Sequence, residues 1–184
     1  MANKIDICSK ALILVGANPI GSFTEDSQES RVSNSEYDDT KEALLTEYLW
    51  DFSIKQEQLG QLVAVPLFDF RYCYQIPADC LRVKLNSARY EYRVYGDKIF
   101  TNLSELKVEY QFNPDESKLP LYFIEALKYK LCEKYALAIT DDKQKYEMFE
   151  AKAHKEAKKA KNIDAQNSTN NYFEDNNFWI TVVR

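Results

Sequence analysis

Residues 12–50 constrain the fold more than any other stretch, because they specify two helices joined by a short corner. Apolar residues at helical spacing predict the first helix at residues 4–15, with Asn3 available as its N-cap. Gly16 suits the left-handed position that ends a helix, and Pro19 forbids continuation of that helix. Local sequence alone therefore specifies the end of the first helix and the corner that follows it.

The second helix is expected to begin between residues 24 and 27, where hydroxyl and acidic side chains favour a helix N-terminus. It should run to Leu49 and bury an apolar stripe, and Trp50 and Phe52 should form an aromatic plug where it ends. Residues 25–51 carry nine acidic and two basic side chains, which gives a local net charge of −7. The second helix should therefore expose a strongly acidic surface.

The middle of the chain predicts a small antiparallel β region. Apolar and polar residues alternate in several short segments, which is the pattern of half-buried strands. Gly96-Asp97 lies between two such segments and indicates a two-residue hairpin. We expect strands at residues 68–76, 81–85, 90–95, 98–101 and 106–112, and an irregular or short extended passage at 53–66. In the first of these strands, the aromatic side chains of Phe68, Phe70, Tyr72 and Tyr74 are expected on one half-buried face.

Two further helices follow. Pro120, at a tolerated first-turn position, begins a mostly apolar helix at residues 120–139, which should be the central core helix. The next helix starts at Asp141 or Asp142 and runs to about Asn162 with a thin apolar stripe. The predicted fold class is α+β: an antiparallel bundle of about four helices with an inserted small antiparallel β-sheet or sandwich and an extended C-terminal tail. The expected domains are the bundle at residues 1–52 and 117–163, the β region at 53–116 and the tail at 164–184.

The tail changes character, because polar and turn-forming residues are followed by large aromatic side chains. Purely disordered segments are poor in such side chains. We expect the tail to order on a neighbouring protein through Tyr172, Phe173, Phe178 and Trp179. The sequence leaves open the alternative that the tail folds back on its own domain.

The sequence patterns of an enzyme are missing. No Walker loop, GxGxxG or GxSxG motif is present, and the 4 glycines are too scattered to build one. His154 lies among lysines, and the adjacent Asp38 and Asp39 would point about 100° apart on a helix. The four cysteines form no CxxC pair, which argues against a zinc site. We expect no catalytic residues, no metal and no cofactor.

The net charge and the hydropathy of the chain limit the kinds of partner that it can be expected to bind. The net charge of −5 argues against a protein that binds nucleic acid by electrostatic attraction. The lysines of the fourth helix lack an interleaved aromatic platform and predict a solvated face. No apolar run reaches the roughly 18 residues of a membrane span, and Lys4 and Asp6 interrupt the run that a signal peptide would need. We expect no membrane partner.

The ordered set of segments resembles the tail tubular protein A family, the head-to-tail adaptors of short-tailed bacteriophages. The resemblance covers residues 2–162, where matching segments occur in the same order. These segments are ALILVGANPIGSFTEDSQESR, LLTEYLWDFS, YQIPADCLRV, YGDKIFTN, LKVEYQF and FIEALKYKLCEKYALAIT.

The resemblance implies a non-enzymatic structural protein of the virion tail or neck, assembled in the host cytoplasm. It implies a ring of about twelve copies that joins the portal protein to the tail nozzle protein and extends the DNA-ejection channel. The helical part would seat against the portal, and the β part would reach towards the nozzle or neighbouring subunits. The C-terminal extension would tie the ring to the portal, and double-stranded DNA would pass through without tight binding.

A channel for DNA should repel its cargo, and the acids of the second helix could provide such a wall. We therefore expect some of these acids to line the channel: Glu36, Asp38, Asp39, Glu42 and Glu47. The four tail aromatics are expected to bind the portal or a neighbouring subunit.

Two other interpretations remain open. One is a small cellular α+β module whose aromatic sheet binds a ligand or peptide, which predicts a stable monomer or dimer with a closed pocket. The other is a different phage neck or head-completion protein with similar helices, which would also oligomerise and would differ in its partner.

Overall fold

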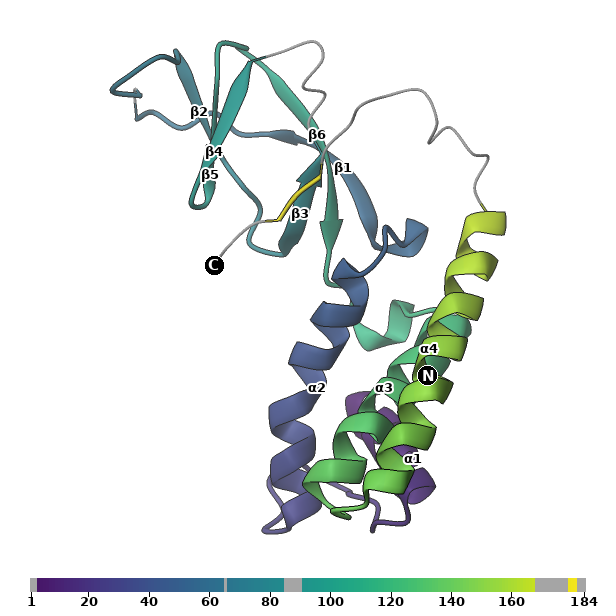
Figure 1. The fold of residues 1–184 in the computed structure, drawn as a ribbon. Helices are drawn as coiled ribbons and strands as arrows, with labels where there is room; N and C mark the ends of the chain where they lie inside the picture. The colour runs from purple at the N-terminus through teal and green to yellow at the C-terminus, as the bar shows by residue number, and fades with distance from the viewer. Residues whose placement is uncertain (1–2, 65, 85–90, 168–178, 182–184) are drawn as a thin grey trace. The chain divides into compact units, whose positions relative to one another are not determined.

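The computed structural model describes residues 3–64, 66–84, 91–167 and 179–181, and the chain divides into two compact units (Figure 1). The helical unit comprises residues 1–52 and 114–169, and the β unit comprises residues 53–113 and 170–184. The β unit is thus inserted between the second and third helices. The α+β fold class predicted from the sequence is confirmed, with four helices packed together and small antiparallel sheets inserted.

The helical unit is organised around its third helix. Its four helices are α1 (Lys4–Val15), α2 (Gln28–Thr46), α3 (Leu121–Ala138) and α4 (Lys143–Gln166). Helix α3 packs against each of the other three, with α2 and α4 on either side of it (Figure 1). Phe123, Leu127, Leu131 and Tyr135 of α3 are fully buried, which confirms its predicted place at the centre of the core.

Helix α1 has the predicted bounds because both of its ends are set by local sequence. The Asn3 side chain accepts a hydrogen bond of 2.7 Å from the Asp6 amide and caps the N-terminus. Gly16 has φ of 85°, and its amide and that of Ala17 bond back to the carbonyls of the last turn. A residue other than glycine would be strained in that conformation.

Helix α2 begins after the N-cap Ser27, as predicted, and ends at Thr46, three residues before the predicted Leu49. The reason is Trp50, which is fully buried and donates its indole N–H to the Leu44 carbonyl at 3.0 Å. That carbonyl belongs to the last turn of the helix, where carbonyl groups commonly take partners from outside the regular helical bonds. Trp50 therefore packs back onto the helix end, where it contacts the rings of Tyr48, Phe52, Tyr122 and Phe123.

Helix α4 begins at the predicted N-cap, Asp142, but runs to Gln166 rather than to about Asn162. The buried stripe of this helix continues through Ala157 and Ala160 to Asp164, a carboxylate that is only 1% exposed. Both of its oxygens have hydrogen-bond partners, since it accepts hydrogen bonds from the Tyr122 hydroxyl and the Asp51 amide. The prediction assigned residue 164 to the tail, and the structure corrects this because a paired carboxylate can occupy a core position.

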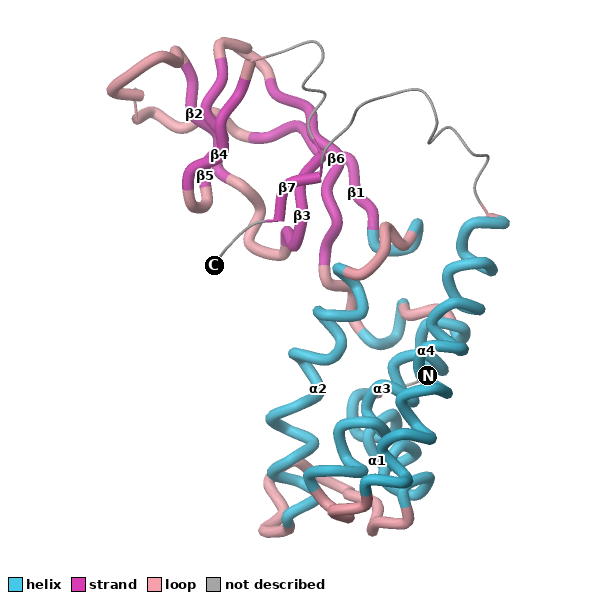
Figure 2. The backbone as a smooth tube through the Cα atoms, in the orientation of Figure 1, coloured by secondary structure: helices cyan, strands magenta, loops and turns pink. Residues whose placement is uncertain are grey.

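The β unit contains two antiparallel sheets (Figure 2). Its strands are β1 (Ile54–Leu59), β2 (Tyr72–Gln75), β3 (Cys80–Lys84), β4 (Tyr92–Tyr95), β5 (Lys98–Thr101), β6 (Leu106–Phe112) and β7 (Trp179–Thr181). The strand orders are β1-β6-β3-β7 and β2-β5-β4. Both sheets contribute to one core, which includes Leu59, Tyr74, Val83, Ile99, Val108 and Tyr110. The predicted hairpin at Gly96-Asp97 joins β4 to β5, with Gly96 at φ of 59°.

The structure resolves one passage that the sequence left open and corrects one strand prediction. Strand β1 lies in the passage expected to be irregular or short and extended, and it bears out the extended alternative. It pairs over its whole length with β6, from Ile54 opposite Gln111 to Leu59 opposite Leu106. It is an edge strand whose central residues are exposed, so its sequence is polar and lacks a buried face. The strand expected at residues 68–76 begins only at Tyr72, and the residues before it form a loop.

Most of the tail aromatics lie outside the described residues, namely Tyr172, Phe173 and Phe178. Trp179 is the first residue of β7, whose backbone pairs with β3, with Lys84 opposite Trp179 and Arg82 opposite Thr181. The end of the tail thus adds a strand to a sheet of its own chain.

Candidate interaction surfaces

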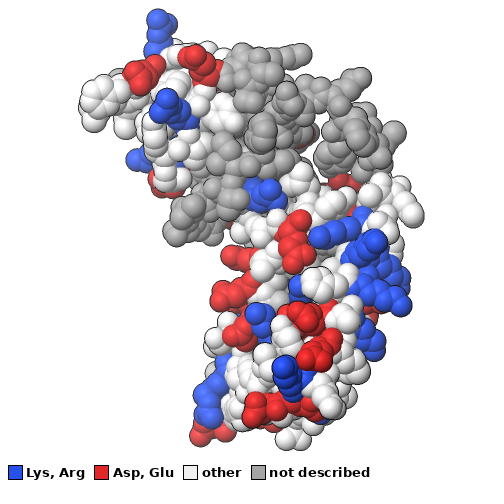
Figure 3. Space-filling view, viewed as in Figure 1, with Lys and Arg blue, Asp and Glu red and all other residues white. Residues whose placement is uncertain are grey.

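The helical unit separates charge between two of its helices. In Figure 3, acidic side chains gather along the α2 edge and basic side chains along α4. The exposed acids of α2 are Asp38, Asp39 and Glu42, and exposed lysines of α4 are Lys152, Lys155, Lys158 and Lys159. Because α2 and α4 lie on either side of α3, the unit has an acidic and a basic side.

The five acids predicted to line a channel do not form one line on α2. At about 100° per residue, Glu36 and Glu47 lie about 20° apart, whereas Asp38 and Glu42 lie roughly on the opposite side of the helix. Together with Asp39 the five acids span about half of the helix circumference. The broad acidic surface is real, but its members face in several directions.

Asp38 and Glu47 form ion pairs within the chain. Asp38 accepts a 2.8 Å hydrogen bond from the Lys4 ammonium group. Glu47, just after the last residue of α2, lies 3.6 Å from Lys130 and 3.4 Å from Lys161. These cations reduce the negative field at both ends of the acidic side. Asp39 and Glu42 lie on the exposed face between them.

The 66–71 loop presents large apolar side chains to solvent. Leu67 is 90% exposed and Phe68 is 80% exposed, and Val63 upstream is 100% exposed. The half-buried face predicted for Phe68 and Phe70 is therefore wrong for Phe68. The signal for a loop was the apolar run that precedes Phe68 and contains Pro66, because that run does not alternate as a strand does.

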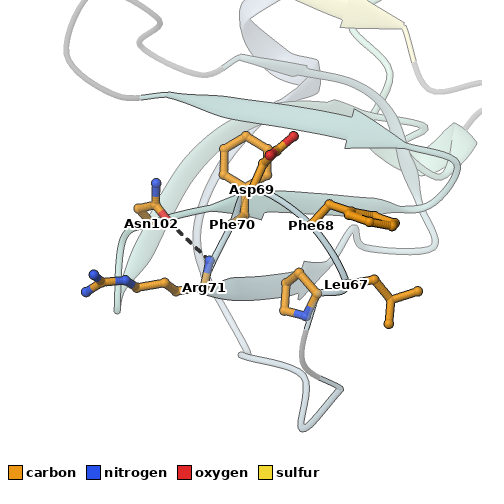
Figure 4. A pocket seen from close by; sticks show the side chains of 7 residues that line it. Leu67, Phe68, Asp69, Phe70, Arg71 and Asn102 are labelled. Atoms are coloured by element: carbon orange, nitrogen blue, oxygen red, sulfur yellow. Dashed lines mark hydrogen bonds between the residues drawn. The ribbon is translucent and has the colours of Figure 1, made fainter.

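The geometry of the 66–71 loop is fixed by hydrogen bonds rather than by a core. The Phe70 amide donates to the Phe68 carbonyl at 2.7 Å, which closes a three-residue turn around Asp69 at φ of 58°. The Arg71 amide donates to the Asn102 side chain at 3.1 Å (Figure 4). In that view Leu67 and Phe68 point away from Arg71 and Asn102, and the loop borders a pocket of about 620 Å³.

A second pocket, of about 220 Å³, lies between the start of α3 and the end of α4. Its apolar walls come from Leu121, Tyr122, Ala160 and Ile163, and Leu121 at its mouth is 74% exposed. Three charged residues complete the lining: Glu125, Glu156 and Lys159. We call this site the α3–α4 pocket.

The cysteines are buried thiols in packed surroundings. Burial raises the pKa of the Cys8 thiol to about 11 and that of Cys132 to about 12. A thiol so disfavoured as a thiolate is a poor nucleophile and a poor metal ligand. Within the described ranges, no three His, Cys, Asp or Glu side chains are grouped so as to hold a metal ion.

Among the helices that the structure describes, none combines the length and the apolar character that a membrane crossing requires.

A scan against protein-family models matched no family, and a search of curated proteins gave no significant match.

Proposed function

We propose that the chain is a non-enzymatic adaptor of a bacteriophage virion, which forms a ring of about twelve copies between the portal and the tail nozzle. The observation that carries the proposal is the insertion of a β unit between α2 and α3 of a four-helix bundle. The resemblance to the tail tubular protein A family implies helical and β parts in this chain order. The exposed apolar side chains and the acidic side of α2 also support a subunit of a larger assembly.

The exposed apolar side chains support a protein that is covered by partners. Leu67, Phe68 and Leu121 are each more than two-thirds exposed, and large exposed apolar groups that gather locally mark contact sites. In the assembly, the helical unit seats against the portal and the β unit reaches the nozzle or a neighbouring subunit. Catalysis has no part in this function.

The acidic side of α2 suits a channel through which DNA passes without being held. Asp39 and Glu42 are the acids that we propose to test, because both are exposed residues within α2. Charge reversal of both to lysine should slow DNA ejection and leave ring assembly intact. A ring structure with all five predicted acids on its outer surface would refute the channel wall.

The C-terminal tail is proposed to tie each copy to the portal or to a neighbouring subunit. Since Asp164 is part of the helical core, a test deletion should begin at residue 168 and leave α4 complete. The deletion also removes β7, which pairs with β3, so circular dichroism must first show that the truncated chain folds. We expect it to fold and to lose portal binding. Portal binding at wild-type strength by the truncated chain would rule out the role of the tail.

Native mass spectrometry of the chain, alone and with its portal protein, tests the adaptor function. The expected result is a complex that carries about twelve copies on the portal. A chain that ignores the portal and other neck proteins contradicts the proposal and favours the ligand-binding module. Assembly on a different neck protein would favour the head-completion alternative.

A further inference from the structure

We propose that the 66–71 loop of one copy inserts Leu67 and Phe68 into the α3–α4 pocket of a second copy. This rests on the proposed function and deepens it, because it names the surfaces that join neighbouring subunits. Both surfaces belong to the same chain, and each lies wholly within one unit, the loop in the β unit and the pocket in the helical unit.

The loop is built to present its apolar pair. Asp69 adopts a left-handed backbone conformation that non-glycine residues rarely occupy, and the turn around it holds Phe68 outward. The bond from the Arg71 amide to Asn102 anchors the loop to the neighbouring β-strand region (Figure 4). Such ordering before binding lowers the entropy lost when the loop docks.

The α3–α4 pocket matches that apolar pair in size and chemistry. An apolar cavity of about 150 Å³ is enough to hold a benzene molecule, and this pocket measures about 220 Å³. One phenyl ring therefore fits, with the walls of Tyr122, Ala160 and Ile163 around it. Leu121 at the mouth, 74% exposed, would be covered by Leu67 in the same contact.

Charge complementarity supports a second copy as the occupant. The loop carries exposed Asp69 and Arg71 next to its apolar pair, and the pocket carries Lys159 and the acids Glu125 and Glu156. The pocket therefore offers a cation for Asp69 and carboxylates for Arg71. Opposed pairs of this kind fix the register of an interface.

The contact is heterologous, since a loop on one copy meets a different surface on the next. A chain of subunits keeps one free loop at one end and one free pocket at the other. Association therefore continues until a ring closes or an open filament grows. A two-fold dimer would leave no free loop and pocket for further association, so an experiment can distinguish the two kinds of contact.

The test uses two variants that each remove one surface. The loop variant carries Leu67→Ser and Phe68→Ser, and the pocket variant carries Leu121→Asp and Ile163→Ser. Met148→Ser, which changes an exposed apolar residue of α4 outside both surfaces, is the matched control. Circular dichroism and thermal unfolding confirm that each variant is folded before its assembly is measured.

Sedimentation velocity over a concentration series up to about 1 mM measures self-association. We expect oligomers from the wild-type and control chains, and at least a tenfold weaker association from each variant alone. An equimolar mixture of the two variants should form a one-to-one heterodimer and stop there, because only one intact loop and one intact pocket meet.

Three outcomes would overturn the inference: a wild-type chain that stays monomeric throughout, a loop variant that assembles like wild type, or variants whose mixture forms no heterodimer. Portal binding, measured separately, distinguishes this failure from that of the proposed function. Self-association that behaves as expected without portal binding would leave the inference standing and remove the adaptor function. Portal complexes that carry twelve copies of the loop variant would leave the adaptor function standing and remove the inference.

Discussion

The hydroxyl of Tyr122 donates a 2.6 Å hydrogen bond to Oδ1 of Asp164, and the Asp51 amide donates to Oδ2 of the same carboxylate at 3.0 Å. Asp164 therefore connects the end of α4, the start of α3 and the segment that follows α2. Burial raises the pKa of this carboxyl, although both hydrogen bonds oppose the shift. A buried carboxyl group therefore links three segments of the helical unit at this end.

We predict that Asp164→Ala destabilises the chain by about 2–4 kcal/mol, because it leaves two buried donors without a partner. Asp164→Asn should cost less than about 1 kcal/mol, since the amide keeps an acceptor for Asp51 and can donate to the Tyr122 oxygen. Urea unfolding at pH 7 measures both, with exposed Glu147→Ala as the neutral control. Equal losses from the two substitutions would show that the hydrogen bonds contribute little.

The raised pKa of Asp164 also has a pH signature. The folded state binds this proton more tightly than the unfolded state, whose carboxyl has the ordinary value of 3.8. The contribution to stability is therefore full below pH 3.8 and declines as pH rises through the folded-state pKa. Asp164→Asn should abolish that decline.

An ion pair between a buried lysine and a half-buried glutamate in the same unit should have the opposite pH dependence. The Lys41 ammonium, 4% exposed, donates to the Pro114 carbonyl at 2.6 Å and to Glu116 Oε1 at 2.9 Å. Desolvation favours a higher pKa for Glu116, but the hydrogen bond and charge of Lys41 outweigh it and lower the pKa. The Tyr37 hydroxyl donates to the same carboxylate at 3.3 Å.

We predict that Lys41→Met destabilises the chain by about 2–4 kcal/mol at pH 7, because Glu116 and the Pro114 carbonyl lose their partner. With its pKa lowered, Glu116 stabilises the fold fully above its ordinary 4.5 and less as pH falls through the folded-state value. The effect of Lys41→Met should therefore shrink in acid. Denaturant unfolding at pH 7 and pH 3 tests this, with exposed Lys158→Met as control. A loss that is the same at both pH values would contradict it.

The elements that sequence predicted well are those specified by neighbouring residues. Asn3 and Gly16 set both ends of α1 within a few residues of themselves, and Gly96 sets the hairpin between β4 and β5. Helix α3 was also predicted within one residue at each end, since its apolar circumference needs burial on all sides. Interactions between residues close in sequence are enough to specify such features.

The errors lie where a distant partner decides. Asp164 ends a core stripe only because Tyr122 and Asp51 satisfy it, and no local signal gives that pairing. Strand β1 can be polar because most of the buried side chains of this strand pair come from its partner, β6. Phe68 was assigned to a strand because aromatic and polar residues alternate from it onwards, and its exposure follows from the turn at Asp69. The α3–α4 pocket could not be predicted, because it forms from residues about 40 positions apart on two helices.

The two glycines of the β unit should respond oppositely to alanine. Gly96 has φ of 59°, where a side chain is strained, so Gly96→Ala should cost about 1–2 kcal/mol. Gly60 has an ordinary φ and open space around its α-carbon, so Gly60→Ala should be neutral or stabilise by up to about 1 kcal/mol. Thermal unfolding of the two variants compares them directly. A smaller loss at Gly96 than at Gly60 would contradict the assigned turn geometry.

The helical core should lose stability in alkaline solution. Burial raises the pKa of the Tyr37 and Tyr135 hydroxyls far above the ordinary 10, and it raises the pKa of Cys8 to about 11 from 9.0. Because the folded state holds these protons more tightly, their contribution is full below the unfolded-state pKa values. It is lost as pH rises from 9.0 through the folded-state values.

We therefore predict that the free energy of unfolding falls steadily above pH 9.0, and that Cys8 and Cys132 resist a thiol reagent at pH 8 until urea is added. Tyrosinate absorbance during an alkaline titration should show the buried Tyr37 and Tyr135 hydroxyls ionising only as the chain unfolds. Cys8→Ala provides the control, since it should reduce the part of the decline that begins at pH 9.0 and leave the contribution of Cys132. Rapid labelling of both thiols in the folded chain would mean that the core between α1 and α3 opens far more often than its packing implies.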